Sequence, residues 1–115
     1  MEKLALFAFN GDFLCFVHVL LNAIDMKENG HDVKIIMEGS ATGLIPQIAQ
    51  EGNPLLPLYR KAKEQNLIEG ACKACSSKMK VAEAVEKEGI PFLDEMSGHP
   101  SMTRYIDNGY RVIVF

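Results

Sequence analysis

The alternation of strand-like and helix-like segments is the feature that most constrains the fold of this 115-residue chain. The first segment, Lys3 to Phe9, is almost continuously apolar, as expected for a strand covered on both faces. Four later segments are also strand-like, and helical patterns separate them. The predicted strands are Lys3 to Phe9, Asp32 to Glu38, Leu67 to Ala71, Ile90 to Glu95 and Tyr110 to Phe115. This alternation predicts right-handed crossovers and a parallel sheet.

Helical patterns fill the intervals between the strands. The first is predicted to close at Gly30, because glycine is the usual residue after a helix end. The predicted helices are Phe13 to Asn29, Leu44 to Gln50, Leu58 to Asn66, Ser76 to Glu88 and Met102 to Asn108. The sequence therefore predicts an α/β fold, with one domain over residues 1–115. It is a three-layer sandwich of about five mostly parallel strands with helices on both faces.

Composition and charge exclude several classes of protein. Apolar residues make up 48% of the chain and charged residues 23%, which is ordinary for a globular domain. The net charge is −3 and no stripe of Lys or Arg is present, so we expect no nucleic-acid partner. The longest apolar stretch, Phe13 to Leu21, is too short to span a bilayer, so we expect no membrane association. No signal-peptide pattern follows the start, and three cysteines do not form a paired disulfide framework, so we expect a soluble, cytoplasmic protein.

Cys72 and Cys75 lie where the third predicted strand gives way to a helix. Reactive groups of open α/β sheets gather outside the carboxyl ends of the strands. A cysteine in the first turn of a helix lies beside unpaired backbone N–H groups and the positive end of the helix dipole, both of which favour the thiolate. Lys73 and Lys78 add positive charge. We therefore predict that both cysteines are catalytic; the alternative is that they only fill space beneath the sheet edge.

His99 is predicted to lie at the same edge, after the fourth strand. An imidazole there could carry protons for the thiols, although a solvated loop residue is an equally good interpretation. Asn10 and Glu38 end their strands beside the same edge, where capping explains them as readily as binding.

A zinc site is a competing interpretation of the cysteines. Cys15 and His18, together with Cys72 and Cys75, supply the three thiolates and one imidazole of a tetrahedral zinc site. Structural zinc ligands usually lie on short loops, whereas Cys15 and His18 fall in an apolar helix. We therefore interpret His18 as a packing residue and predict no metal.

The first helix predicts an assembly. In the helix from Phe13 to Met26, apolar residues occupy nearly the whole circumference through Leu21 instead of one stripe. Such a helix is buried on more than one side, so we predict a homo-oligomer with this helix at the interface. Periodicity alone supports equally well the alternative that other helices of the same chain cover it.

The whole chain resembles the DsrE/DsrF-like proteins of the TusD and YchN type. The matching features are the "NG" turn after the first strand, "HDVKIIMEG", "GACKACSSKMKV" and the final "GYRVIVF". The resemblance implies a small α/β sandwich that assembles as a homotrimer or homohexamer and carries sulfur in a relay. Cys72 matches the sulfur-bearing cysteine, and Cys75 matches a second cysteine that only some members carry. "SSKMKV" lacks the small-Arg-Gly ending of better-known members.

These features together predict a sulfur-relay protein. Cys72 would hold sulfane sulfur as a persulfide, taken from a donor protein and passed to a thiol of an acceptor protein, with no cofactor required. Whether the protein is a sulfurtransferase enzyme or a carrier stays open. One alternative is a Cys-x-x-Cys dithiol oxidoreductase or persulfide reductase, although such a motif is expected after an early strand. The other is an oligomeric binding module with inert thiols.

Overall fold

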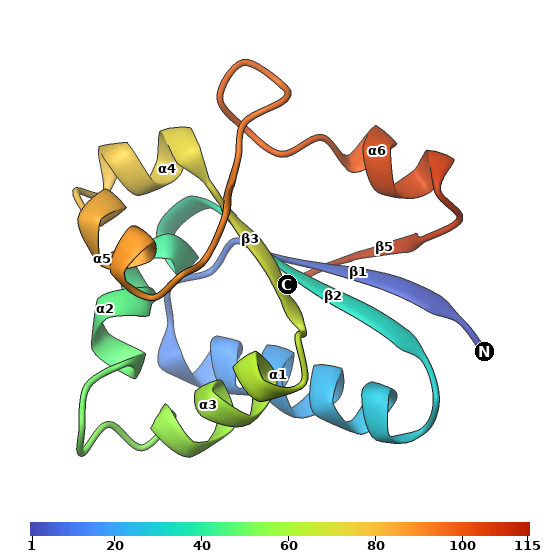
Figure 1. Cartoon of the computed structure of the whole chain (residues 1–115), viewed down its shortest axis with the longest axis horizontal. Helices are drawn as coiled ribbons and strands as arrows, with labels where there is room; N and C mark the ends of the chain where they lie inside the picture. Colours follow the sequence, from blue (N-terminus) through green and yellow to red (C-terminus); the bar gives the residue numbers. More distant parts are fainter.

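The computed structural model describes residues 1–115 and contains one five-stranded sheet. The strands are β1 (Lys3–Ala8), β2 (Asp32–Met37), β3 (Ile68–Cys72), β4 (Phe92–Leu93) and β5 (Arg111–Val114). Their order in the sheet is β4-β3-β2-β1-β5, and every neighbouring pair is parallel (Figure 1). The predicted fold class, a parallel sheet inside an α/β sandwich, is therefore confirmed.

Helices cover the two faces of the sheet unequally. The helices are α1 (Phe13–Glu28), the 3₁₀ helix η1 (Gly39–Leu44), α2 (Ile45–Ile48), α3 (Leu56–Glu64), α4 (Lys73–Lys78), α5 (Ala82–Lys87) and α6 (Met102–Asp107). One face packs on α1, α2, α3 and α5 in a core of 23 buried residues, and the other packs on α6 through a cluster of 5. The alternating direction of side chains sends Leu6 of β1 to the first core and Phe7 to the second. This explains why β1 is apolar at nearly every position. None of the helices has the length and apolar character needed to cross a membrane.

The boundaries of α1 follow from its capping residues. Asp12 accepts a hydrogen bond from the Leu14 backbone N–H at 2.9 Å, which satisfies one of the free donors of the first turn. The chain leaves the helix at Gly30, whose φ of 89° is accessible to glycine without strain. The predicted helix, Phe13 to Asn29, is confirmed to within one residue.

The predicted helix from Ser76 to Glu88 is wrong in one respect, because two helices, α4 and α5, occupy this region. Lys80 has a left-handed φ of 61°, and the Val81 N–H donates to the Ser76 carbonyl oxygen at 2.9 Å, as in a Schellman helix end. No glycine marks this break in the sequence, so the helical periodicity is continuous from Ser76 to Glu88. The helix also begins earlier, directly after Cys72.

Gly70 allows β4 to approach β3 closely. A Cβ atom at this position would lie 2.7 Å from Leu93 Cγ and 2.8 Å from the Pro91 carbonyl oxygen. Only glycine therefore permits this pairing without a shift of the backbone. The close approach brings the loop after β4 alongside the carboxyl end of β3, where the two cysteines lie. In Figure 1 this orange loop projects beyond the carboxyl edge of the sheet, on the side of α4.

Candidate functional site

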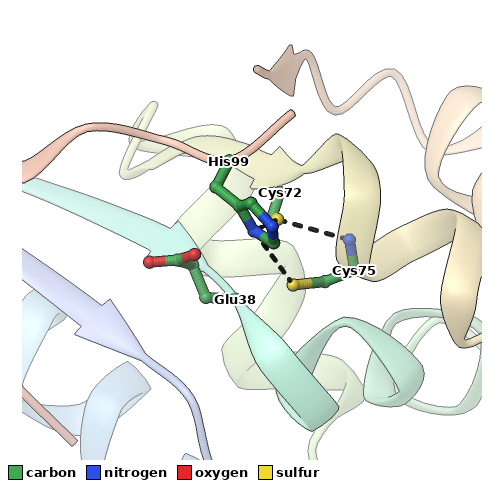
Figure 2. A group of neighbouring side chains, drawn as sticks. All are labelled: Glu38, Cys72, Cys75 and His99. Carbon is green, nitrogen blue, oxygen red and sulfur yellow. Dashed lines mark hydrogen bonds between the residues drawn. The ribbon is translucent and has the colours of Figure 1, made fainter. Parts of the chain in front are cut away.

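Four side chains with reactive or ligating groups meet at the carboxyl edge of the sheet: Glu38, Cys72, Cys75 and His99. Each offers one ligand atom, and these four atoms all lie within 4.8 Å of one another. Glu38 follows β2, Cys72 ends β3, Cys75 lies in α4, and His99 lies in the loop after β4. Figure 2 shows the imidazole beside both sulfurs. The sequence-predicted candidates Cys72, Cys75 and His99 therefore lie in one site.

The Cys72 sulfur contacts a possible base and a backbone donor. It lies 3.1 Å from Nδ1 of His99, and the same nitrogen lies 3.7 Å from the Cys75 sulfur (Figure 2). The Cys75 backbone N–H donates to the Cys72 sulfur at 3.3 Å, so Cys72 is the N-cap of α4. Both thiols are free. This N–H contact is the one expected for a cysteine at the start of a helix.

The expectation that this contact makes Cys72 a thiolate is wrong for this conformation. Cys72 is fully buried, and burial raises its pKa to about 12. The neighbouring Cys75 thiol raises the pKa further, and the Cys75 N–H only partly opposes these effects. Lys73, which the sequence suggested as a source of positive charge for the thiols, is exposed, and its Nζ lies 3.9 Å from the Asp94 carboxylate. Burial therefore favours the thiol form of Cys72, so a neighbouring base is needed to activate it.

Glu38 belongs to the site, although the sequence explained it equally well as a capping residue. It precedes η1, but its side chain makes no capping hydrogen bond there. Only 6% of the residue is exposed, and burial raises the pKa of its carboxyl group to about 6, with a hydrogen bond to Cys72 acting in the opposite direction. The useful signal in the sequence was an acidic residue at the end of an apolar, buried strand, since a carboxylate is rarely placed there without a partner.

The loop after β4 is fixed against α4, which determines the position of His99. The Gly98 carbonyl oxygen accepts a hydrogen bond from the Ala74 N–H at 2.9 Å. Met96 and His99 pair through two backbone hydrogen bonds of 2.8 and 2.9 Å. Gly98 has a φ of 90°, and a Cβ atom there would lie 3.2 Å from the Ala74 Cβ. Backbone contacts therefore fix the position of residue 99, and they do not depend on its imidazole side chain.

The remaining candidates lie outside the site. Cys15 and His18 are on α1 and do not belong to the group of possible ligands, so the zinc site that combines them with Cys72 and Cys75 does not form. His18 is exposed, which makes its interpretation as a packing residue wrong. The Asn10 side chain accepts a hydrogen bond from the Asp12 N–H at 2.9 Å and so stabilises the turn before α1.

Comparison with known proteins identifies one family and two relatives of this chain. A family model described as the DsrE/DsrF-like family matches residues 4–115. An uncharacterized protein of Methanocaldococcus jannaschii is 36% identical over 97 residues, which cover 84% of this chain and 77% of that protein. An uncharacterized protein of Archaeoglobus fulgidus is 39% identical over 59 residues, which cover 51% of this chain and 95% of that protein. No solved structure matches this chain significantly.

Proposed function

The chain belongs to the DsrE/DsrF-like family, and on this premise we propose that it carries sulfur in a relay, with Cys72 as the sulfur-bearing residue. A sulfur-relay role fits membership of this family. The observation that carries the assignment to Cys72 is the pair of contacts on its sulfur, one to His99 Nδ1 at 3.1 Å and one from the Cys75 N–H. The first can remove the thiol proton, and the second can stabilise the sulfur anion that results.

The uptake step conserves atoms and electrons. His99 Nδ1 accepts the thiol proton, in the tautomer that carries the other ring proton on Nε2. The Cys72 sulfur attacks the outer sulfur of a donor persulfide, and the sulfur–sulfur bond of the donor breaks as the new bond forms. The donor's inner sulfur leaves as a thiolate and takes the proton from His99. Delivery repeats this exchange, with a thiolate of an acceptor protein attacking the outer sulfur on Cys72. No oxidant, reductant or cofactor is consumed.

The position of Cys75 supports a second outcome. Its sulfur lies 3.7 Å from the same His99 nitrogen and within 4.8 Å of the Cys72 sulfur. A Cys75 thiolate can attack the inner sulfur of the Cys72 persulfide, which forms a Cys72–Cys75 disulfide and releases sulfide. The protein would then act as a persulfide reductase, and an external dithiol would have to reduce the disulfide before the next cycle.

Peptide mapping tests the assignment of the sulfur. The reduced protein is exposed to a low-molecular-weight persulfide in the presence of a chelator, and its cysteines are then alkylated and digested with trypsin. Lys73 lies between the two cysteines, so cleavage after it places Cys72 and Cys75 on different peptides. We expect one additional sulfur on the Cys72 peptide. Additional sulfur only on the Cys75 or Cys15 peptide would contradict this assignment.

We also propose that α1 forms a contact between copies of this chain. Leu14 is 76% exposed, and Phe13 and Leu21 on the same helix are also exposed, so the other helices of the chain leave this apolar surface uncovered. Leu14→Glu should lower the sedimentation coefficient of the wild-type oligomer to that of a monomer. Ile106→Glu, at an exposed apolar residue of α6, is the control. A monomeric wild type at micromolar concentration would remove this proposal.

A further inference from the structure

The same four side chains have the composition of a zinc-binding site. Two thiols, one imidazole and one carboxylate are the ligand types that Zn²⁺ takes from proteins. They are contributed by three separate parts of the chain, and all four ligand atoms lie within 4.8 Å of one another. From this arrangement we propose that Glu38, Cys72, Cys75 and His99 bind one Zn²⁺ ion in tetrahedral geometry.

The distances between the ligand atoms are close to those that zinc requires. Zn–S bonds of about 2.3 Å and Zn–N bonds of about 2.0 Å place sulfur and nitrogen about 3.5 Å apart in a tetrahedron. The two sulfur–nitrogen distances in the structure, 3.1 Å for Cys72 and 3.7 Å for Cys75, lie on either side of this value. The longest separation, at most 4.8 Å, must shorten by about one ångström. Side-chain rotations of the half-buried Cys75 and His99 can adjust the distances from these two ligands.

The surroundings of these four side chains favour metal binding. Glu38 and Cys72 are buried, so little water competes for them, while the half-buried Cys75 and His99 leave an entry path for the ion. The Glu38 carboxyl group is not used in capping η1. The backbone of Cys72 is held by the Ser76 hydroxyl, which donates to its carbonyl oxygen at 2.7 Å. Fixed ligands of this kind reduce the ordering that binding requires.

Binding involves proton release and no change of oxidation state. Each cysteine forms one Zn–S bond and loses its thiol proton to solvent, so two thiolates neutralise the ion. The Glu38 carboxylate then gives the bound cluster a net charge of −1. Because both sulfurs are occupied in the zinc form, Zn²⁺ should protect Cys72 and Cys75 from alkylation while Cys15 stays reactive. This protection is independent of any reaction with persulfides.

Metal titration of the reduced full-length chain tests the site. Zn²⁺ is titrated in competition with a chromophoric chelator, and Co²⁺ serves as the spectroscopic probe. We expect one ion per chain, with sulfur-to-cobalt charge-transfer absorption and the intense visible bands of tetrahedral Co²⁺. Cys75→Ser and His99→Gln should each weaken Zn²⁺ binding by more than about tenfold. Loss of a residue that only hydrogen-bonds to a metal ligand already costs about tenfold, and loss of a ligand should cost more. Glu38→Gln should weaken it by about tenfold.

Cys15→Ser and His18→Gln are the matched controls, since they make the same substitutions on α1, and both should bind Zn²⁺ as tightly as the wild type. Circular dichroism establishes that each variant is folded. Cys75 and His99 are half-buried, so their variants decide the test even if Glu38→Gln does not fold. Wild-type affinity in Cys75→Ser and His99→Gln, equal weakening in the controls, or octahedral Co²⁺ without charge transfer would each overturn the zinc site. None of these results would affect the peptide mapping, which is done with a chelator present.

Discussion

Replacing Cys72 with serine should reduce the sulfur taken up by the protein to the level found without a donor. Serine presents a hydroxyl group that cannot form a stable bond to sulfane sulfur under these conditions. The substitution should leave the fold intact, because serine is a preferred N-cap residue and its oxygen can accept the Cys75 N–H that the Cys72 sulfur accepts now. The measurement is the intact mass of Cys72→Ser after exposure to a low-molecular-weight persulfide.

Two further variants make this result specific. Cys15→Ser removes a thiol outside the site and should load one sulfur like the wild type. Cys75→Ser removes the thiol that can attack the Cys72 persulfide, so the loaded form should persist longer and no internal disulfide should appear. Loading of Cys72→Ser to the wild-type level would mean that Cys72 does not carry the sulfur. If Cys75→Ser alone loses the sulfur, the half-buried Cys75 thiol is the acceptor and Cys72 has a supporting role.

The sequence determined the architecture because the pattern of β1 and β2 leaves few alternatives. A nearly continuous apolar strand joined by a capped helix to a second strand favours a parallel crossover. Parallel pairing then places the carboxyl ends of β1, β2, β3 and β4 at one edge. Because the ends of these strands share one edge, the sequence alone predicted that Cys72 and His99 lie near each other. The break between α4 and α5 was not predictable, because it depends on a left-handed Lys80 instead of a glycine.

The electrostatics of the site were the least predictable part. The N–H of Cys75 could be expected from a helix start, but the complete burial of Cys72 depends on which loops fold over the sheet edge. Burial dominates because removing a thiolate from water costs more than one backbone hydrogen bond returns. The role of Glu38 was difficult to predict for the same reason. It depends on whether the carboxyl group caps η1 or turns toward the cysteines.

Replacing His99 with alanine should slow persulfide uptake by about 100-fold, the lower limit for loss of a proton-transferring group. Burial favours the thiol form of Cys72, so its reaction requires a nearby base, and His99 Nδ1 lies 3.1 Å from the sulfur. The loop should keep its position in His99→Ala, since the pairing of residue 99 with Met96 uses backbone atoms only. The rate is measured by stopped-flow mixing with a persulfide in a chelator-containing buffer.

Added imidazole distinguishes proton transfer from a structural role for His99. The substitution leaves space beside Cys72, and free imidazole that enters it should restore part of the rate in a concentration-dependent manner. N-methylated imidazole of similar basicity should also rescue if it fits, whereas a neutral pyrrole, which has no basic nitrogen, should not. His18→Ala removes an exposed histidine from α1 and should react at the wild-type rate. A loss of rate that imidazole does not rescue, in a His99→Ala protein of unchanged stability, would show that the imidazole positions the loop and does not accept the proton.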